Sequence, residues 1–65
     1  MEITLNGEVK KIEAGNIYDL IKSFGLDSDG VVILHNDEIV KKELWTTSNL
    51  SVKDSVEVLY FVSGG

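Results

Sequence analysis

A chain of 65 residues is long enough for one domain and leaves no room for a second. It has no cysteine and a single histidine, His35, so a disulfide framework and a cysteine-based metal site are both excluded. Eleven acidic residues against six lysines give a net charge of −5, which opposes binding to nucleic acid or to an anionic membrane.

The first segment has the pattern of a β-hairpin. Ile3-Thr4-Leu5 alternates apolar and polar side chains, and Asn6-Gly7 is the residue pair best suited to a two-residue turn with positive φ. The return strand, 8–13, is less regular, because Val9 and Ile12 have opposite parity. Either a bulge interrupts this strand or only part of it pairs.

The next segment predicts one amphipathic helix from Ile17 to Leu26. Asn16 suits the N-cap position, and Asp19 places an acidic side chain in the first turn. Gly25 suits the left-handed position that closes a helix, with Leu26 packing back across the end. The apolar side chains recur at i, i+3, i+4 and i+7: Ile17, Leu20, Ile21 and Phe24.

Three further strands are expected after the helix. The β-branched run 31–34 alternates too little for a strand exposed on one side, so it predicts a well-covered strand. Asn36-Asp37 turns the chain into a short strand at Ile39-Val40. The polar stretch 41–51 that follows has three apolar anchors, Leu44, Trp45 and Leu50, and Trp45 is expected in the core.

The last predicted strand runs from Val56 to Val62. Its alternation places Val56, Val58 and Tyr60 on one face and Glu57, Leu59 and Phe61 on the other. A single helix covers only one face of a sheet, so Leu59 and Phe61 are expected on the uncovered face. The element order is therefore β-β-α-β-β-β, an α+β domain that spans residues 1–65.

The whole chain resembles the ThiS family of thiamin-pathway sulfur carriers, which are small ubiquitin-like β-grasp proteins. The resemblance rests on the element order, the length and the ending 54–65, which closes on Ser63-Gly64-Gly65. Its other marks are the opening Ile3-Thr4-Leu5-Asn6-Gly7, the helix, the Leu34-His35-Asn36 turn, and Val40 followed shortly by Trp45. It implies a mixed sheet of four to five strands packed on one helix, with the first and last strands parallel neighbours at its centre. The chain differs from the usual family pattern at Lys53, where a glycine often precedes the aspartate, and in lacking the proline often found soon after the fourth strand.

The resemblance also implies the chemistry. In the family, the working group is the C-terminal carboxylate, here that of Gly65, which a partner enzyme adenylates with ATP and Mg²⁺ and which is then converted to a thiocarboxylate. Carboxylate anions resist nucleophilic attack, so activation is required. Glycine at positions 64 and 65 removes Cβ, and lets a flexible tail from Ser63 enter a narrow channel.

The implied partners are a ubiquitin-activating-enzyme-like adenylyltransferase, thiazole synthase, and a sulfur donor such as a cysteine desulfurase. Leu59, Phe61, Ser63 and Gly64 are the expected partner-binding residues, because outward apolar side chains would lead directly to the reactive tail. We expect no metal and no cofactor bound by this chain itself, and no enzymatic activity of its own, since it has no nucleophile–base pair. The chain is a substrate of its partners.

Two alternatives stay open at this point. One is the same chemistry in another pathway, as in the small subunit of molybdopterin synthase. The other is an interaction module that binds a partner through its sheet without covalent chemistry. The stretch Met1–Asn6 does not resemble a signal peptide, and the cytoplasm is the expected location.

Overall fold

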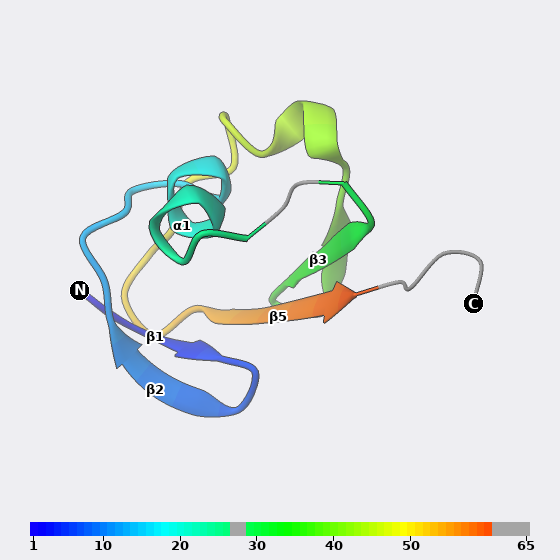
Figure 1. The fold of residues 1–65 in the computed structure, drawn as a ribbon. Coiled ribbons are helices and arrows are strands. Elements are labelled where there is room, and N and C mark those ends of the chain that lie inside the picture. Colours follow the sequence, from blue (N-terminus) through cyan, green and yellow to red (C-terminus); the bar gives the residue numbers. More distant parts are fainter. Residues whose placement is uncertain (27–28, 61–65) are drawn as a thin grey trace.

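The computed structural model describes residues 1–26 and 29–60, and in that part of the chain one helix packs on a mixed sheet of five strands (Figure 1). The elements are β1 (Glu2–Leu5), β2 (Glu8–Lys11), α1 (Ile17–Ser23), β3 (Val31–His35), β4 (Glu38–Val40), the 3-10 helix η1 (Lys42–Leu44) and β5 (Ser55–Tyr60). This order confirms the predicted β-β-α-β-β-β, with η1 as an addition that the sequence did not predict.

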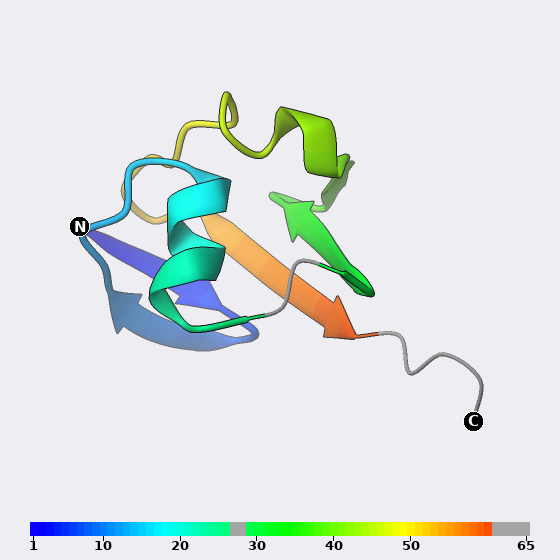
Figure 2. The same cartoon turned by 45° about the horizontal axis from the view of Figure 1, so that its top comes forward.

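The strands are arranged β2-β1-β5-β3-β4, so β5 lies at the centre of the sheet. It runs parallel to β1 and antiparallel to β3, while the β1–β2 and β3–β4 pairs are antiparallel. A parallel pair requires a long crossover connection, and here α1 and the segments after it supply that connection. Figure 2 shows α1 lying across one face of the sheet.

The β1–β2 hairpin has the predicted turn. Asn6 and Gly7 have φ of 50° and 83°, as a turn with two left-handed residues requires. The pairing runs without interruption until Lys11 faces Glu2, so the irregular return strand contains no bulge and only part of it pairs. Ile12, just past the ladder, is 8% exposed and belongs to the core, whereas Val9 faces solvent at 68%.

Local signals explain where α1 begins. The Asn16 side chain accepts a hydrogen bond from the Asp19 N–H at 2.8 Å, which satisfies one of the first backbone donors of the helix. Ile17, Leu20 and Ile21 face the sheet and are buried. The predicted apolar face of the helix is therefore correct over its first two turns.

The helix ends earlier than the predicted Leu26. Gly25 has φ of 68°, its N–H donates to the Lys22 carbonyl at 3.0 Å, and the Leu26 N–H donates to the Ile21 carbonyl at 3.2 Å. This pair of bonds is a Schellman closure, as the glycine predicted. Phe24 has the spacing of the apolar face but is 43% exposed, because it lies beyond the last turn that the sheet covers.

The core lies between α1 and the sheet. Its fully buried side chains are Trp45, Ile3, Ile17, Leu20, Ile33 and Val56. Trp45 is 1% exposed, as predicted, and its indole N–H donates to the Val40 carbonyl at 3.0 Å. Leu44, also predicted as an anchor, is 52% exposed, because consecutive side chains of a 3-10 helix diverge by about 120° and Trp45 is the one that turns inward.

The covered strand predicted at 31–34 is covered on one face only. β3 has neighbours on both edges, but of its five residues only Ile33, which faces α1, is fully buried. The flanking side chains are half-buried. A run of apolar residues without alternation thus supplies the core on one side of the sheet and an apolar surface on the other.

Candidate functional site

The candidate site lies where β5 ends. In Figures 1 and 2 the C-terminal end of β5 is on the side of the molecule opposite the N-terminus. Of the predicted site residues, Leu59 is within the described part of the chain. The other four, Phe61, Ser63, Gly64 and Gly65, lie outside the described residues.

Leu59 faces away from the core. Val56 and Val58 are buried at 0% and 7% exposure, and Leu59, one position on, is 43% exposed. Because side chains alternate along a strand, Leu59 lies on the sheet face that α1 does not cover. The predicted orientation of these three side chains is therefore correct.

Leu59 is part of a larger apolar surface on that face. Val32 is directly opposite Leu59 in the β3–β5 pair, and Leu34 is directly opposite Ile39 in the β3–β4 pair. Ile39 is 70% exposed. We call Val32, Leu34, Ile39 and Leu59 the open-face patch. Sequence reasoning found Leu59 alone, although the unbroken apolar run 31–34 carried a signal for the others, since a run without alternation places apolar side chains on both faces.

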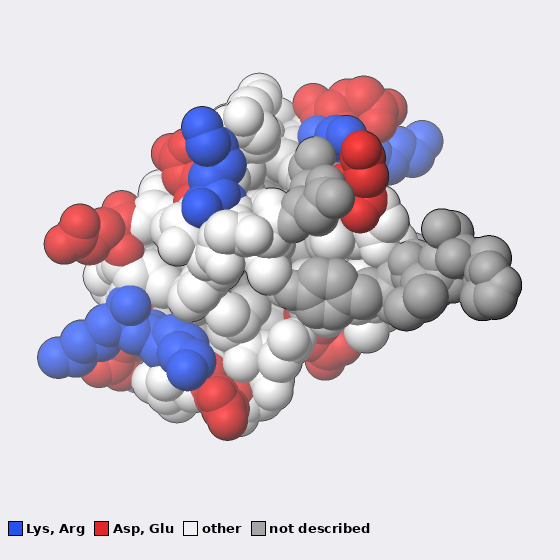
Figure 3. All heavy atoms as spheres, viewed as in Figure 1, with Lys and Arg blue, Asp and Glu red and all other residues white. Residues whose placement is uncertain are grey.

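On the face that Figure 3 shows, Lys side chains and Asp or Glu side chains lie next to one another in several groups, and uncharged atoms fill much of the middle. Glu57, exposed and opposite Leu34 on β3, adds a negative charge beside the open-face patch. A partner that covers this patch must therefore satisfy one carboxylate as well as apolar side chains.

His35 belongs to a hydrogen-bonded cluster at the other end of β5. Its Nε2 lies 2.7 Å from Asp54 Oδ2, which also accepts the Ser51 N–H at 2.8 Å. The Asn36 amide donates to Asp54 Oδ1 at 3.3 Å and accepts the Ser55 N–H at 2.8 Å. The cluster ties the β3–β4 turn to the loop before β5, which is a structural role for His35.

The Asp54 carboxylate is stabilised by this cluster. Partial burial acts to raise its pKa, but the hydrogen bonds from His35, the Ser51 N–H and Asn36 outweigh burial and hold the pKa below the reference value of 3.8. In the part of the chain that the structure describes, no group of three potential metal ligands is present. None of its helices is long and apolar enough to cross a membrane.

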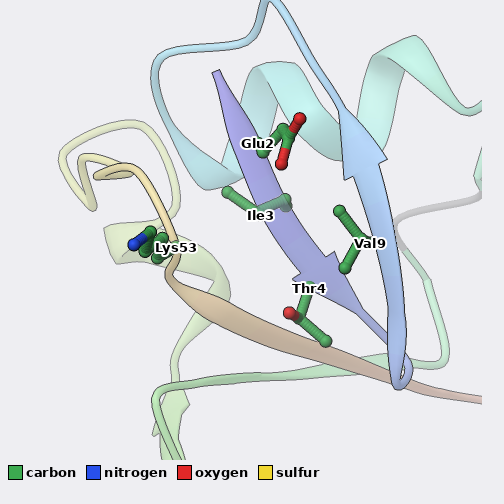
Figure 4. Close-up of a pocket in the computed structure, with 5 residues that line it drawn as sticks. All are labelled: Glu2, Ile3, Thr4, Val9 and Lys53. Carbon is green, nitrogen blue, oxygen red and sulfur yellow. The ribbon is translucent and has the colours of Figure 1, made fainter.

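A depression of about 320 Å³ lies on the hairpin, next to the loop that leads into β5. Its lining residues are Glu2, Ile3, Thr4 and Val9 from the hairpin and Lys53 from that loop (Figure 4). The Lys53 N–H donates to the Glu2 carbonyl at 2.7 Å, which ties the two segments together. Since Lys53 precedes β5, this depression lies near the beginning of β5, whereas the candidate site lies at its end.

The fold is of the β-grasp class, to which ubiquitin-like proteins belong. In this class a helix packs on a mixed sheet, and the first and last strands lie parallel and side by side at its centre, as β1 and β5 do. A model of the ThiS family matches residues 3–65, nearly the entire chain. The chain therefore belongs to the ThiS family.

Individual relatives agree with this assignment. The chain is 38% identical over 65 residues to the sulfur carrier protein ThiS of Bacillus subtilis, a match that covers 97% of this chain and 98% of that protein. The crystal structure of the thiamine biosynthesis protein ThiS from Geobacter metallireducens superposes with a TM-score of 0.87 at 26% identity and covers all of both chains. A solution structure of a thiamine biosynthesis protein from the same organism gives a TM-score of 0.80 and is covered to 88%.

Proposed function

We propose that this chain is a sulfur carrier for the thiazole part of thiamin, and that the carboxylate of Gly65 is the group that carries the sulfur. The observation that supports this most is the extent of the family match, which runs through residue 65 and so includes the Gly-Gly end. The Bacillus subtilis relative, similar over nearly its full length, is named a sulfur carrier. Residues 1–65 form a single carrier domain in this proposal.

The chemistry has two steps, both in a partner's active site. An oxygen of the Gly65 carboxylate attacks the α-phosphorus of Mg²⁺-bound ATP, which forms an acyl-adenylate and releases pyrophosphate. A sulfide-level nucleophile then attacks the acyl carbon and displaces AMP, so that sulfur takes the place of one carboxylate oxygen. When a cysteine desulfurase supplies the sulfur as a persulfide, the first product is an acyl disulfide, and a second thiol cleaves its S–S bond, releases the thiocarboxylate and leaves as a disulfide. Because the chain has no cysteine, it offers no thiol that could carry a persulfide instead.

The chain's own contribution is to present its end and to bind the partner. Three extended residues from Ser63 reach roughly 10 Å. The absence of side chains at residues 64 and 65 suits a narrow channel. The open-face patch is the proposed docking surface, because apolar anchors near the centre of an interface carry much of its binding free energy.

The partners in this proposal are an adenylyltransferase related to ubiquitin-activating enzymes, a sulfur donor such as a cysteine desulfurase, and thiazole synthase as acceptor. The carrier is then a substrate of these enzymes and not itself a catalyst. Their compartment is the cytoplasm in this proposal.

Changes at the C-terminus distinguish a carrier from an interaction module. Deleting Gly65, or adding one alanine after it, should leave the melting temperature unchanged and abolish thiocarboxylate formation in the presence of adenylyltransferase, ATP and a sulfur source. If either variant still supported thiamin synthesis in cells that lack the natural carrier, the interaction module would be the better account.

The pathway needs a separate test. Thiazole synthase should be retained by immobilised carrier, whereas the large subunit of molybdopterin synthase should not. Retention of the large subunit alone would assign the same sulfur chemistry to the other pathway.

A further inference from the structure

The parallel pairing between β1 and β5 stops before β5 does. The last directly opposed pair is Leu5 with Val56, and the Asn6 N–H still donates to the Val56 carbonyl at 2.9 Å. At Asn6, with φ of 50°, the chain turns away into β2. Figures 1 and 2 both show β5 continuing past this turn, toward the C-terminus.

The Asn6 side chain extends the pairing by one bond. The Val58 N–H donates to Asn6 Oδ1 at 2.8 Å, so a side-chain carbonyl stands where a straight β1 would place its next backbone carbonyl. This substitution satisfies the last donor that the hairpin can reach. It is also the last hydrogen bond between the end of β1 and β5.

Three backbone groups of β5 lie beyond that bond. Backbone groups alternate between the two edges of a strand, and those of Val56 and Val58 point to the β1 side, so those of Tyr60 do as well. The groups are the Val58 carbonyl and the N–H and carbonyl of Tyr60. The β1–β5 pairing ends at Leu5 and Val56, so none of these three groups takes part in it.

We propose that this free edge, from the Val58 carbonyl to the Tyr60 carbonyl, pairs with an extended strand of the activating adenylyltransferase, which thereby adds a strand to the sheet. The inference rests on the proposed function. An acceptor, a donor and an acceptor in a row match the backbone of an extended segment, and such pairing gives affinity without a particular side-chain sequence.

The place of the edge in the chain argues for this occupant. Tyr60 is followed by five residues, the last of which carries the proposed reactive carboxylate. A strand fixed on both edges, by β3 on one side and by the partner on the other, would set the direction in which these five residues leave the sheet. Fixing that direction in advance lowers the entropic cost of placing the carboxylate against ATP.

The shortness of the edge argues against a second copy of this chain as the occupant. Strands that pair stably are usually longer than the two residues available here, and short edges are one way in which natural sheets avoid pairing with one another. The partner can make up for this short pairing by also contacting the open-face patch. Leu59, which belongs to that patch and is exposed, lies between Val58 and Tyr60 in β5.

Amide hydrogen exchange resolved by residue tests the edge. In the free protein the Tyr60 amide should exchange rapidly, whereas the amide of Leu59, which faces β3, should exchange slowly. In the complex with adenylyltransferase and an ATP analogue whose α,β-phosphate linkage cannot be cleaved, exchange of the Tyr60 amide should slow by about tenfold or more, with Leu59 as the internal control. Unchanged exchange at Tyr60 in a complex that forms would overturn the inference.

A semisynthetic chain provides a second measurement. Replacing the Tyr60 amide by an ester removes the donor, keeps the side chain and weakens the Leu59 carbonyl as an acceptor in the β3–β5 pair. The variant should therefore fold with a somewhat lower melting temperature, and its affinity for the adenylyltransferase, measured below that temperature, should fall about 2- to 10-fold. Equal affinity of the ester variant and the wild type would contradict pairing at this edge. The proposed function would still stand if the chain became thiocarboxylated. A wild-type chain that neither binds the enzyme nor becomes thiocarboxylated would overturn both.

Discussion

Replacing Asn6 with glycine removes the side-chain carbonyl that ends the β1–β5 pairing and keeps a residue that readily adopts φ of 50°. The lost bond is the 2.8 Å contact between Asn6 Oδ1 and the Val58 N–H, a partly buried pair. A hydrogen bond of this kind contributes about 0.5–1.5 kcal/mol net, and the greater freedom of glycine in the unfolded chain adds about 0.5 kcal/mol.

The sum is about 1–2 kcal/mol, which for a domain of this size lowers the melting temperature by roughly 4–15 °C. The assay is thermal unfolding followed by circular dichroism, together with amide exchange at Val58, which should accelerate. Asn6→Asp is the matched control, because it keeps an oxygen at the Oδ1 position and should recover most of the loss. The reasoning is refuted if Asn6→Gly melts like the wild type, or if aspartate destabilises as much as glycine.

Three further predictions concern stability. Val58→Asp should unfold the domain, because it places an unpaired charge in a core position at a cost of more than about 3 kcal/mol. Leu59→Asp puts the same charge on the exposed face one position on and should melt within a few degrees of wild type. Equal melting of the two variants would contradict the inward orientation of Val58 and the outward orientation of Leu59. Lys53→Gly should raise stability by up to about 1 kcal/mol in urea titrations, because Lys53 has φ of 70°, a strained angle for a lysine, and relief of this strain exceeds the cost of glycine's greater freedom in the unfolded chain. A lower midpoint would argue against that strain. Because the pKa of Asp54 is lowered in the folded state, its contribution to folding stability is complete above the unfolded pKa of 3.8 and is lost as the pH falls below that value. The melting temperatures of wild type and Asp54→Asn should therefore converge in acid. A constant difference at all pH values would contradict the stabilising role of the cluster.

Local signals in the sequence predicted the local structure well. Asn16 and Gly25 mark the two ends of α1 because the hydrogen bonds that form each end join residues only three to five positions apart. Asn6-Gly7 likewise specifies its own turn. Period-2 alternation gave the correct facing of Val56 and Val58, since it depends on the strand alone.

What the sequence could not predict depends on partners that are distant in the chain. Phe24 has helical spacing, yet whether it is covered depends on how far the sheet extends beneath the helix. The parity of Val9 and Ile12 left two arrangements open, and the register against β1 decides between them. The role of Asn6 as acceptor for Val58 involves residues 52 positions apart, so no local pattern contains it.

The candidate site was predicted in part. The outward facing of Leu59 followed from alternation, whereas its apolar neighbours Val32 and Ile39 follow only from the β5-β3-β4 order of strands. The central parallel pair also joins the two ends of the chain, and the family resemblance supplied it where periodicity could not. The Gly-Gly end lies outside the described residues, and its role rests on the sequence and the family.

The most direct test of the account is the intact mass of the chain after incubation with its adenylyltransferase, ATP, Mg²⁺ and a sulfur source. The account predicts a mass increase equal to the replacement of one oxygen by sulfur, located by fragmentation at Gly65 and dependent on ATP. An unchanged mass, or sulfur found anywhere other than the C-terminal glycine, would contradict it.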